Sequence, residues 1–198
     1  NKQFIIIGNI NCVTYKEVFP LLRDNKVWMG CTIHSGDREF GVPDEYPLEA
    51  AGCRIDENGK KYIRVKGVRW YTNIDHGRRH NPLSLMSMAD NIKYSKHKDI
   101  QGKKYQHYDN YDAIEIPYTD AIPCDYENLM GVPVTFLDKY CPEQFDIIWQ
   151  ACGNTRASAP KEILDEVGYT IHPEDRGGCG VVNNKRQYAR ILIRKKHL

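Results

Sequence analysis

The feature that most constrains the fold is a continuous apolar run near the start of the chain, Phe4–Ile7, which is closed by Gly8 and Asn9. Its residues are mainly β-branched, and they do not alternate with polar ones as they would in a strand with one solvent-facing side. This pattern is typical of a central parallel strand that is covered on both faces. The sequence therefore predicts a strand at the centre of a larger sheet.

The residues after this run predict a strand, helix, strand unit. Thr14 followed by Glu17 is a capping-box pattern, and Pro20 limits the helix to a short or bent one. Val27–Met29 is the second expected strand. Such a unit indicates an α/β layer. A lone unit of this kind cannot cover an apolar strand on both sides, so we expect its neighbouring strands to lie before residue 1.

The rest of the chain predicts mixed and loop-rich structure. Residues 32–60 are rich in turn formers, and residues 77–112 are polar, basic and tyrosine-rich with little periodicity, which indicates an ordered loop or a docking segment. The remaining expected elements are strands at 62–66, 68–72, 145–149 and 188–194, and a helix at 160–167 that begins at a proline and ends before Gly168.

Charge is distributed unevenly along the chain. The formal net charge is only +2, yet residues 60–104 contain twelve Lys and Arg against three acids, and residues 37–58 contain seven acids against two bases. A basic segment inside a nearly neutral chain indicates contact with a polyanion, because neutralised phosphates release counterions. The alternative is a solvated surface whose charges pair with the acidic segments. Charge alone leaves both interpretations open.

Several kinds of chemistry lack their motifs. The sequence has no phosphate-binding loop and no nucleophile elbow. Its only Asp-x-Lys, at Asp24–Lys26, is interpreted as a turn, and no Glu-x-Lys occurs, so a metal-dependent nuclease is not predicted. Gly177–Gly180 is best interpreted as a turn, because no strand directly precedes it. The seven cysteines are scattered without zinc spacing, and Gly77–Arg79 between His76 and His80 is too cationic for a metal pair. Metal binding is therefore not supported, and reduced thiols favour a cytoplasmic protein.

Asn9 and Asn11 directly follow the apolar strand. In α/β sheets ligands bind beyond the carboxyl ends of the strands, so these side chains would face such a site. Asparagine is also a common turn former, and this second interpretation remains open.

Five segments together resemble the EcoRI-type adenine-specific modification methylases. The resemblance is most specific in Met130–Tyr140 with Pro142–Phe145. The other matching segments are Lys2–Asn11, Tyr15–Pro20, Arg69–His76 and the closing Tyr188–Ile193.

The resemblance implies part of a Rossmann-like methyltransferase of the restriction-modification type, which moves a methyl group from S-adenosylmethionine to adenine N6 in duplex DNA. Such proteins carry a glycine-rich cofactor motif and an Asn-Pro-Pro-aromatic catalytic motif, and both would lie upstream of this chain. Asn81-Pro82 is followed by Leu83 and does not match. The resemblance therefore places no catalytic residue here and implies that the chain is inactive without its N-terminal half.

The same resemblance assigns Phe4–Ile7, Val27–Met29 and Arg69–Thr72 to the fifth, sixth and seventh strands of the methyltransferase sheet, the last two as a hairpin interrupted by an acidic insertion. Residues 1–76 would complete the catalytic domain, and residues 77–198 would form a DNA-recognition region with a terminal strand, helix and strand.

Duplex DNA is the expected partner. Extracting a base from its stack costs a few kcal/mol, which phosphate and groove contacts offset, and the basic segment with its interleaved tyrosines suits that task. Asn9 and Asn11 would lie near the target adenine in a supporting role. The alternative is a non-catalytic nucleic-acid-binding module. The candidate DNA contacts are Lys60, Lys61, Arg64, Arg69, Arg78, Arg79 and His80.

Overall fold

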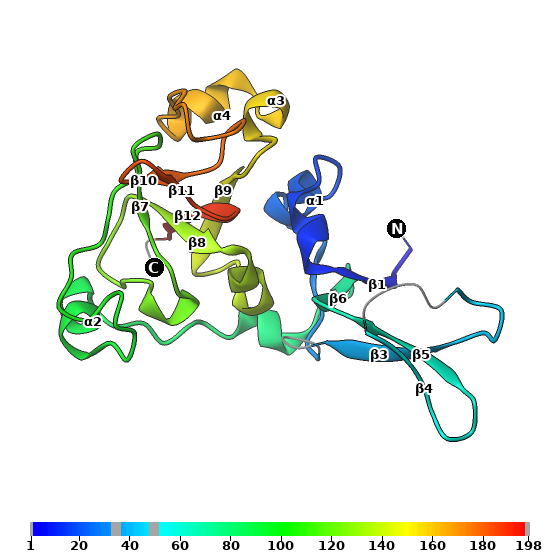
Figure 1. Cartoon of the computed structure of the whole chain (residues 1–198). Helices are drawn as coiled ribbons and strands as arrows, with labels where there is room; N and C mark the ends of the chain where they lie inside the picture. The colour runs from blue at the N-terminus through cyan, green and yellow to red at the C-terminus, as the bar shows by residue number, and fades with distance from the viewer. Residues whose placement is uncertain (1, 33–36, 48–51, 197–198) are drawn as a thin grey trace.

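The computed structural model describes residues 2–32, 37–47 and 52–196, and over these ranges the chain is an α/β protein with four separate sheets (Figure 1). The strands are β1 (Ile5–Asn9), β2 (Trp28–Met29), β3 (Arg38–Val42), β4 (Cys53–Ile55), β5 (Lys61–Val65), β6 (Val68–Thr72), β7 (Ala113–Glu115), β8 (Leu129–Pro133), β9 (Phe145–Ala151), β10 (Val181–Val182), β11 (Lys185–Arg186) and β12 (Arg190–Lys195). The α-helices are α1 (Phe19–Arg23), α2 (Met88–Tyr94), α3 (Thr155–Ser158) and α4 (Lys161–Glu166). The 3₁₀ helices are η1 (Ile10–Thr14), η2 (Gly77–His80), η3 (Thr119–Ala121) and η4 (Val134–Lys139).

The first sheet has the order β1-β6-β2, and β6 pairs antiparallel with both neighbours. β1 and β2 therefore run parallel to each other, with the antiparallel β6 inserted between them. The hairpin expected from Val27–Met29 and Arg69–Thr72 is present as the pairing of β2 with β6. The segment that interrupts it forms a sheet of its own.

Within the described residues the first strand lies at an edge of its sheet, so its expected central position stays a prediction that depends on strands before residue 1. β1 pairs only with β6, so its other edge is open there. Ile5, Ile6 and Ile7 are 61%, 55% and 49% exposed. The apolar pattern was that of a covered strand, but no described element supplies the cover.

The capping box expected at Thr14 is also wrong. Thr14 ends η1, where its hydroxyl donates to the Asn11 carbonyl at 3.0 Å, and α1 begins later, at Phe19. Pro20 lies in the first turn of α1, where its missing N–H costs nothing. The helix is short, as the proline predicted.

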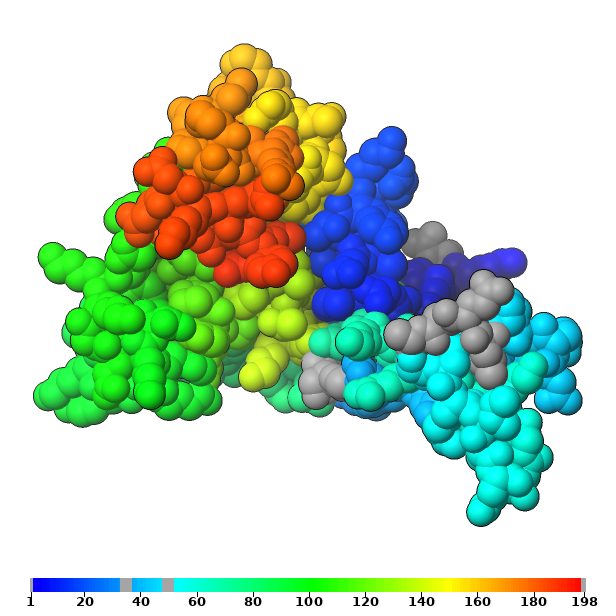
Figure 2. Space-filling view, viewed as in Figure 1, coloured from blue at the N-terminus to red at the C-terminus, as the bar shows by residue number. Residues whose placement is uncertain are grey.

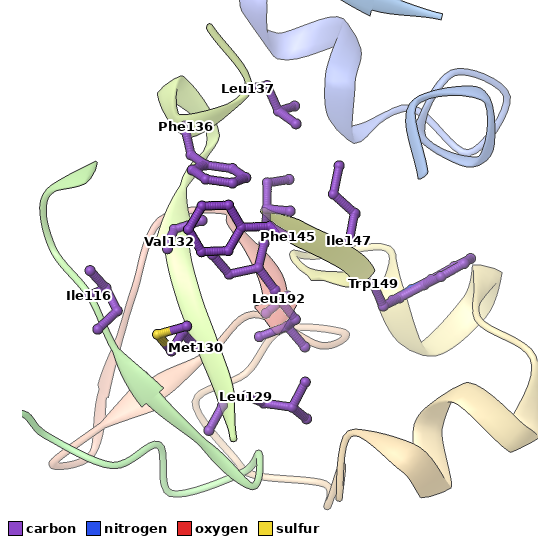
Figure 3. Packing of buried hydrophobic residues seen from close by; sticks show 14 of the residues in the cluster. Ile116, Leu129, Met130, Val132, Phe136, Leu137, Phe145, Ile147, Trp149 and Leu192 are labelled. Atoms are coloured by element: carbon purple, nitrogen blue, oxygen red, sulfur yellow. The ribbon is translucent and has the colours of Figure 1, made fainter. Parts of the chain in front are cut away.

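The main core surrounds the mixed sheet β7-β8-β12-β9, in which only β7 and β8 are parallel. Figure 3 shows Phe136, Phe145, Leu192 and their neighbours packed against this sheet. The strands expected at 145–149 and 188–194 correspond to β9 and β12. The helix expected at 160–167 corresponds to α4. Gly168, which follows the end of this helix, has a positive φ of 60°.

The sheet β3-β5-β4 projects from the body as an arm, which Figure 2 shows in cyan. None of its strand residues is buried. From the pairing register, one face is polar and aromatic, and the other is mostly apolar. The apolar face carries Phe40, Val42, Cys53, Ile55, Ile63 and Val65, with Arg38 and Lys61 at its ends.

Residues 77–112, expected to show little regular structure, contain η2 and the short helix α2. The Ser87 hydroxyl caps α2 by accepting from the Asp90 amide at 3.0 Å. This local hydrogen bond gives the polar segment a helix that periodicity did not reveal.

A buried ion pair joins the first sheet to the main core. Arg69 on β6 binds Asp138 in η4 through Nε–Oδ1 and Nη2–Oδ2 distances of 2.7 and 2.9 Å, and both side chains are 5% exposed. The Gln144 side chain forms a second link by pairing with both backbone groups of Leu83. A third is the edge-to-face contact of Phe19 with Trp149 at 5.3 Å.

No helix within the described ranges is long and apolar enough to cross a membrane. None of the described cysteines forms a disulfide, and no group of three or more His, Cys, Asp or Glu residues in these ranges could hold a metal ion.

We predict that Arg69→Met destabilises the protein by about 3–5 kcal/mol, because it leaves the buried Asp138 carboxylate without its guanidinium. Urea unfolding measures the cost, and the double variant Arg69→Met/Asp138→Leu should recover part of it. Arg64→Met is the matched control. It breaks a surface pair with Asp37 and should cost less than about 1 kcal/mol. Equal losses at Arg69 and Arg64 would show that the buried pair has no special role.

Candidate nucleic-acid interface

Three of the expected DNA contacts lie on the arm. The Lys60 ammonium lies 5.5 Å from the centre of the Tyr62 ring, and Lys61 Nζ donates to the Asp44 carbonyl. Arg64 pairs with Asp37 at 2.7 Å while 62% of its side chain stays exposed. These cations remain accessible, and their contacts within the protein are surface ones that a phosphate can displace.

Two others are occupied inside the protein. Arg69 is committed to the buried pair with Asp138. Arg79 is 8% exposed, lies 3.6 Å above the Trp28 ring, and donates to Asp75 and Asn25. Residue type predicted DNA contacts at these positions, whereas burial makes them structural. We therefore do not propose Arg69 and Arg79 as DNA contacts.

Arg78 is exposed and is held in place by its hydrogen bond to the Cys31 carbonyl at 2.9 Å. It borders a hollow of about 250 Å³ where η2, η3 and η4 meet. The hollow combines hydrogen-bond donors and acceptors, which suits a polar ligand. Its lining residues are Arg78, Asn81, Pro82, Leu83, Ser84, Thr119, Asp120, Asp138 and Lys139.

Lys139 and Asn81 in this lining were not expected as site residues. Lys139 lies sixty-one positions after Arg78, so only the folded chain brings the two together. Asn81 belongs to an Asn-Pro pair that does not complete the catalytic motif. No local signal identifies either one.

His80 lies between two carboxylates. Its Nε2 is 2.9 Å from Asp75 Oδ1, and its Nδ1 is 2.8 Å from Glu143 Oε1. Both ring nitrogens must donate to satisfy these acceptors, which favours the imidazolium. The hydrogen bond with Asp75, then that with Glu143, raises the pKa of His80. The ring thereby links η2 to the residue pair that precedes β9.

Asn9 and Asn11 lie at the end of β1, as expected. The Asn9 side chain is used locally: its Oδ1 accepts from the Asn11 amide at 2.9 Å, and its Nδ2 donates to the Lys66 carbonyl at 2.7 Å. This is the turn-forming role. Asn11 is exposed at the start of η1. At the other end of η1, the Thr14 carbonyl accepts from Asn154 at 3.0 Å, which fixes η1 against the main core.

Comparison with known proteins assigns the chain to a family. The family model described as adenine-specific methyltransferase EcoRI matches residues 1–196. The chain belongs to the EcoRI adenine-specific methyltransferase family.

Three relatives give the extent of the similarity. The chain is 39% identical to the type II methyltransferase M.EcoRI of Escherichia coli over 198 residues, which is 100% of the chain and 52% of that protein. It is 32% identical to the type II methyltransferase M.MgeORF184P of Mycoplasma genitalium over 202 residues, covering 100% of the chain and 58% of the relative. It is 27% identical to the type II methyltransferase M.MpnI of Mycoplasma pneumoniae over 198 residues, covering 98% of the chain and 57% of the relative.

The chain thus spans little more than half the length of these family members. No solved structure matches it significantly. The family match over residues 1–196 confirms the resemblance seen in segments of residues 1–150 and in the closing strand. It extends that resemblance over nearly the whole chain.

We predict that His80 makes stability depend on pH. Because folding raises the pKa of His80, its stabilisation is fully present below the ordinary value of about 6.5 and is lost as pH rises through the raised value. The thermal midpoint should fall over this interval, and His80→Gln should remove that part of the slope. His107→Gln, which changes an exposed histidine elsewhere, should retain it. An unchanged slope in His80→Gln would contradict the assignment.

Proposed function

We propose that this chain is the C-terminal part of a DNA methyltransferase that transfers a methyl group from S-adenosylmethionine to adenine N6 at a specific duplex sequence. The observation that carries the proposal is the family match across residues 1–196, together with relatives named as type II methyltransferases. The adenine target comes from the description of the family.

The open edge of β1 supports the presence of an upstream half in the complete protein. Three consecutive isoleucines with both faces exposed are unfavourable in water, because an exposed apolar strand edge is a site for pairing with another strand. The same sheet borders a mostly apolar hollow of about 340 Å³. Its lining residues are Ile5, Gly30, Cys31, Thr32, Trp70, Thr72, Ile74 and His76.

We infer that strands and a covering layer from the upstream half occupy this edge and this hollow. β1, β2 and β6 would then be the last three strands of a Rossmann-like sheet, with β6 inserted antiparallel. The relatives have the length that such a half requires, since this chain corresponds to 52–58% of each. The division of function at residue 76 belongs to the same proposal.

We infer that the site for S-adenosylmethionine lies outside this chain. β1 leads into η1, and neither segment contains a glycine-rich loop that opens a helix. We therefore infer that the upstream half holds the cofactor and the catalytic motif, and that this chain supplies neither. Its contribution is to hold DNA and to complete the sheet.

The DNA contacts proposed for this chain are cations that solvent can reach. Lys60, Lys61 and Arg64 on the arm would contact phosphates, and Arg78 with Lys139 would contact DNA at the polar hollow. His80 stays a candidate because its ring is exposed beside Arg78 and its two carboxylate partners raise its pKa. Asn11 would lie near the target adenine, because it follows the carboxyl end of β1.

We predict that the complete protein, supplied with methyl-labelled S-adenosylmethionine and a pool of duplexes, yields N6-methyladenine detectable by mass spectrometry of the nucleosides. Arg78→Ala should weaken duplex binding and make the slope of log K against log salt shallower by about 0.9, the value for one phosphate contact. Lys161→Ala, which removes a cation on α4, should leave both unchanged.

The isolated chain provides the contrast for the same assay. It should bind duplex DNA weakly and in a salt-dependent way, bind no S-adenosylmethionine in calorimetry, and transfer no methyl group. A complete protein that binds DNA but never methylates it would instead be the non-catalytic binding module. Salt-independent binding would exclude both functions.

We predict that Ile5→Glu destabilises the complete protein by about 2–4 kcal/mol, because it places a carboxylate inside the interface with the upstream half. The control is Ile55→Glu on the arm. Ile55 is 57% exposed and Ile5 is 61% exposed in this chain, so the two substitutions match in type and exposure. The control should change the unfolding free energy by less than about 0.5 kcal/mol. Equal effects would show that the β1 edge is not an interface.

A further inference from the structure

The hairpin β10–β11 has the geometry of a rigid two-stranded ribbon. Its strands pair antiparallel as Val181↔Arg186 and Val182↔Lys185. Asn183 and Asn184 connect them with positive φ angles of 50° and 58°. Two positive φ values define the type I′ turn, whose twist matches that of the paired strands, and asparagine is one of the few residues that adopt it readily.

The base of this hairpin is fixed to the main core by side chains of residues 108–110. The Asn110 amide donates to the Cys179 carbonyl and accepts from the Val181 amide, both at 2.9 Å. The Asp109 carboxylate accepts from the Asn184 amide at 2.8 Å. Gly180 packs directly on the ring of the buried Tyr108, where a side chain would not fit. The hairpin is therefore held in one orientation.

The outer strand and the residues after it carry exposed functional groups. Lys185 and Arg186 are exposed, and neither forms an ion pair with a carboxylate of the described residues. Tyr188 is 90% exposed, more than any other large hydrophobic residue in the described ranges. The Gln187 amide donates to the Gly180 carbonyl at 2.8 Å, which fixes the backbone next to Tyr188.

Arg190, two residues beyond Tyr188, shows that the chain can neutralise a cation here. It binds Glu115 at 2.6 Å, and the side chains of this pair are 12% and 9% exposed. Arg190, the β12 cation that faces the core, is therefore paired with a carboxylate. Lys185, Arg186 and Tyr188 remain exposed to solvent on a hairpin whose orientation is fixed.

We propose that the hairpin β10–β11 with Tyr188 is a second DNA-contacting element, separate in sequence from the basic segment 60–104. Lys185 and Arg186 bind backbone phosphates, and the Tyr188 ring packs against a sugar or base of the same DNA. A two-stranded ribbon fits the major groove, and an aromatic ring beside cations is the combination that binds nucleic-acid bases. This inference rests on the proposed function, since it assumes a DNA substrate.

The alternative occupant is the upstream half of the protein, which would cover Tyr188 by packing. The charge favours DNA, because burying two cations against protein requires carboxylate partners, whereas phosphate provides them at every nucleotide. The β1 edge differs in this respect, since it is apolar and carries no exposed cation.

The test uses the complete protein and a fluorescent 30-base-pair duplex, with binding followed by anisotropy over a range of salt concentrations. Lys185→Ala/Arg186→Ala should weaken binding and make the slope of log K against log salt shallower by about 1.8, the value for two phosphates. Tyr188→Ala should weaken binding by about 5- to 100-fold with an unchanged slope, and Tyr188→Phe should retain wild-type affinity because the ring remains.

Ile171→Ala is the control, because Ile171 is a 73% exposed large hydrophobic residue that belongs to none of the proposed DNA contacts. Wild-type affinity in both Tyr188→Ala and the double variant would overturn the inference. So would a lowered thermal midpoint in Tyr188→Ala with unchanged DNA binding, which would assign the hairpin to the upstream half. Failure of the unsubstituted protein to bind duplex DNA would instead overturn the proposed function.

Discussion

The arrangement of this chain depends on the buried ion pair between Arg69 and Asp138. Arg69 lies on β6, the middle strand of the first sheet, and Asp138 lies in η4, which follows β8 of the main core. A guanidinium and a carboxylate that are both 5% exposed have lost their hydration, so each tolerates burial only while the other is present. The bidentate geometry also fixes direction, because two parallel hydrogen bonds form in only one orientation. The pair therefore sets how the first sheet sits on the core.

The neighbouring contacts use the same region. Arg79 on Trp28, Gln144 on the Leu83 backbone and His80 between Asp75 and Glu143 all connect η2 and its surroundings to the first sheet or to the start of β9. As a result, a basic segment that could have been a loose loop is tied down at several points. Arg78 is presented at the polar hollow by a segment that its own neighbours hold rigid. Part of this order comes from Arg79 and Gln144, which are buried and therefore do not reach DNA.

Sequence predicted those elements whose signals are local. The apolar runs of β9 and β12, the proline start and glycine end of α4, and the turn at Gly177–Gly180 all depend on neighbouring residues. It did not predict β8 as a strand, because its pairing with β7 and β12 joins distant segments. Arg69 and Arg79 were expected at the surface for the same reason: residue type gives charge, and only the fold gives burial. Lys139 belongs to a segment that identified the family, yet its place beside Arg78 required the structure.

The open edge of β1 has a consequence for how such a protein is made. A ribosome releases the N-terminal portion of a polypeptide first, so in the proposed complete protein the strands that flank β1 would already exist when its isoleucines emerge. The vulnerable edge would then be capped within the time of synthesis. Expressed without that portion, the same three residues would meet only solvent or the edges of other copies, and the chain would be prone to self-association at this strand.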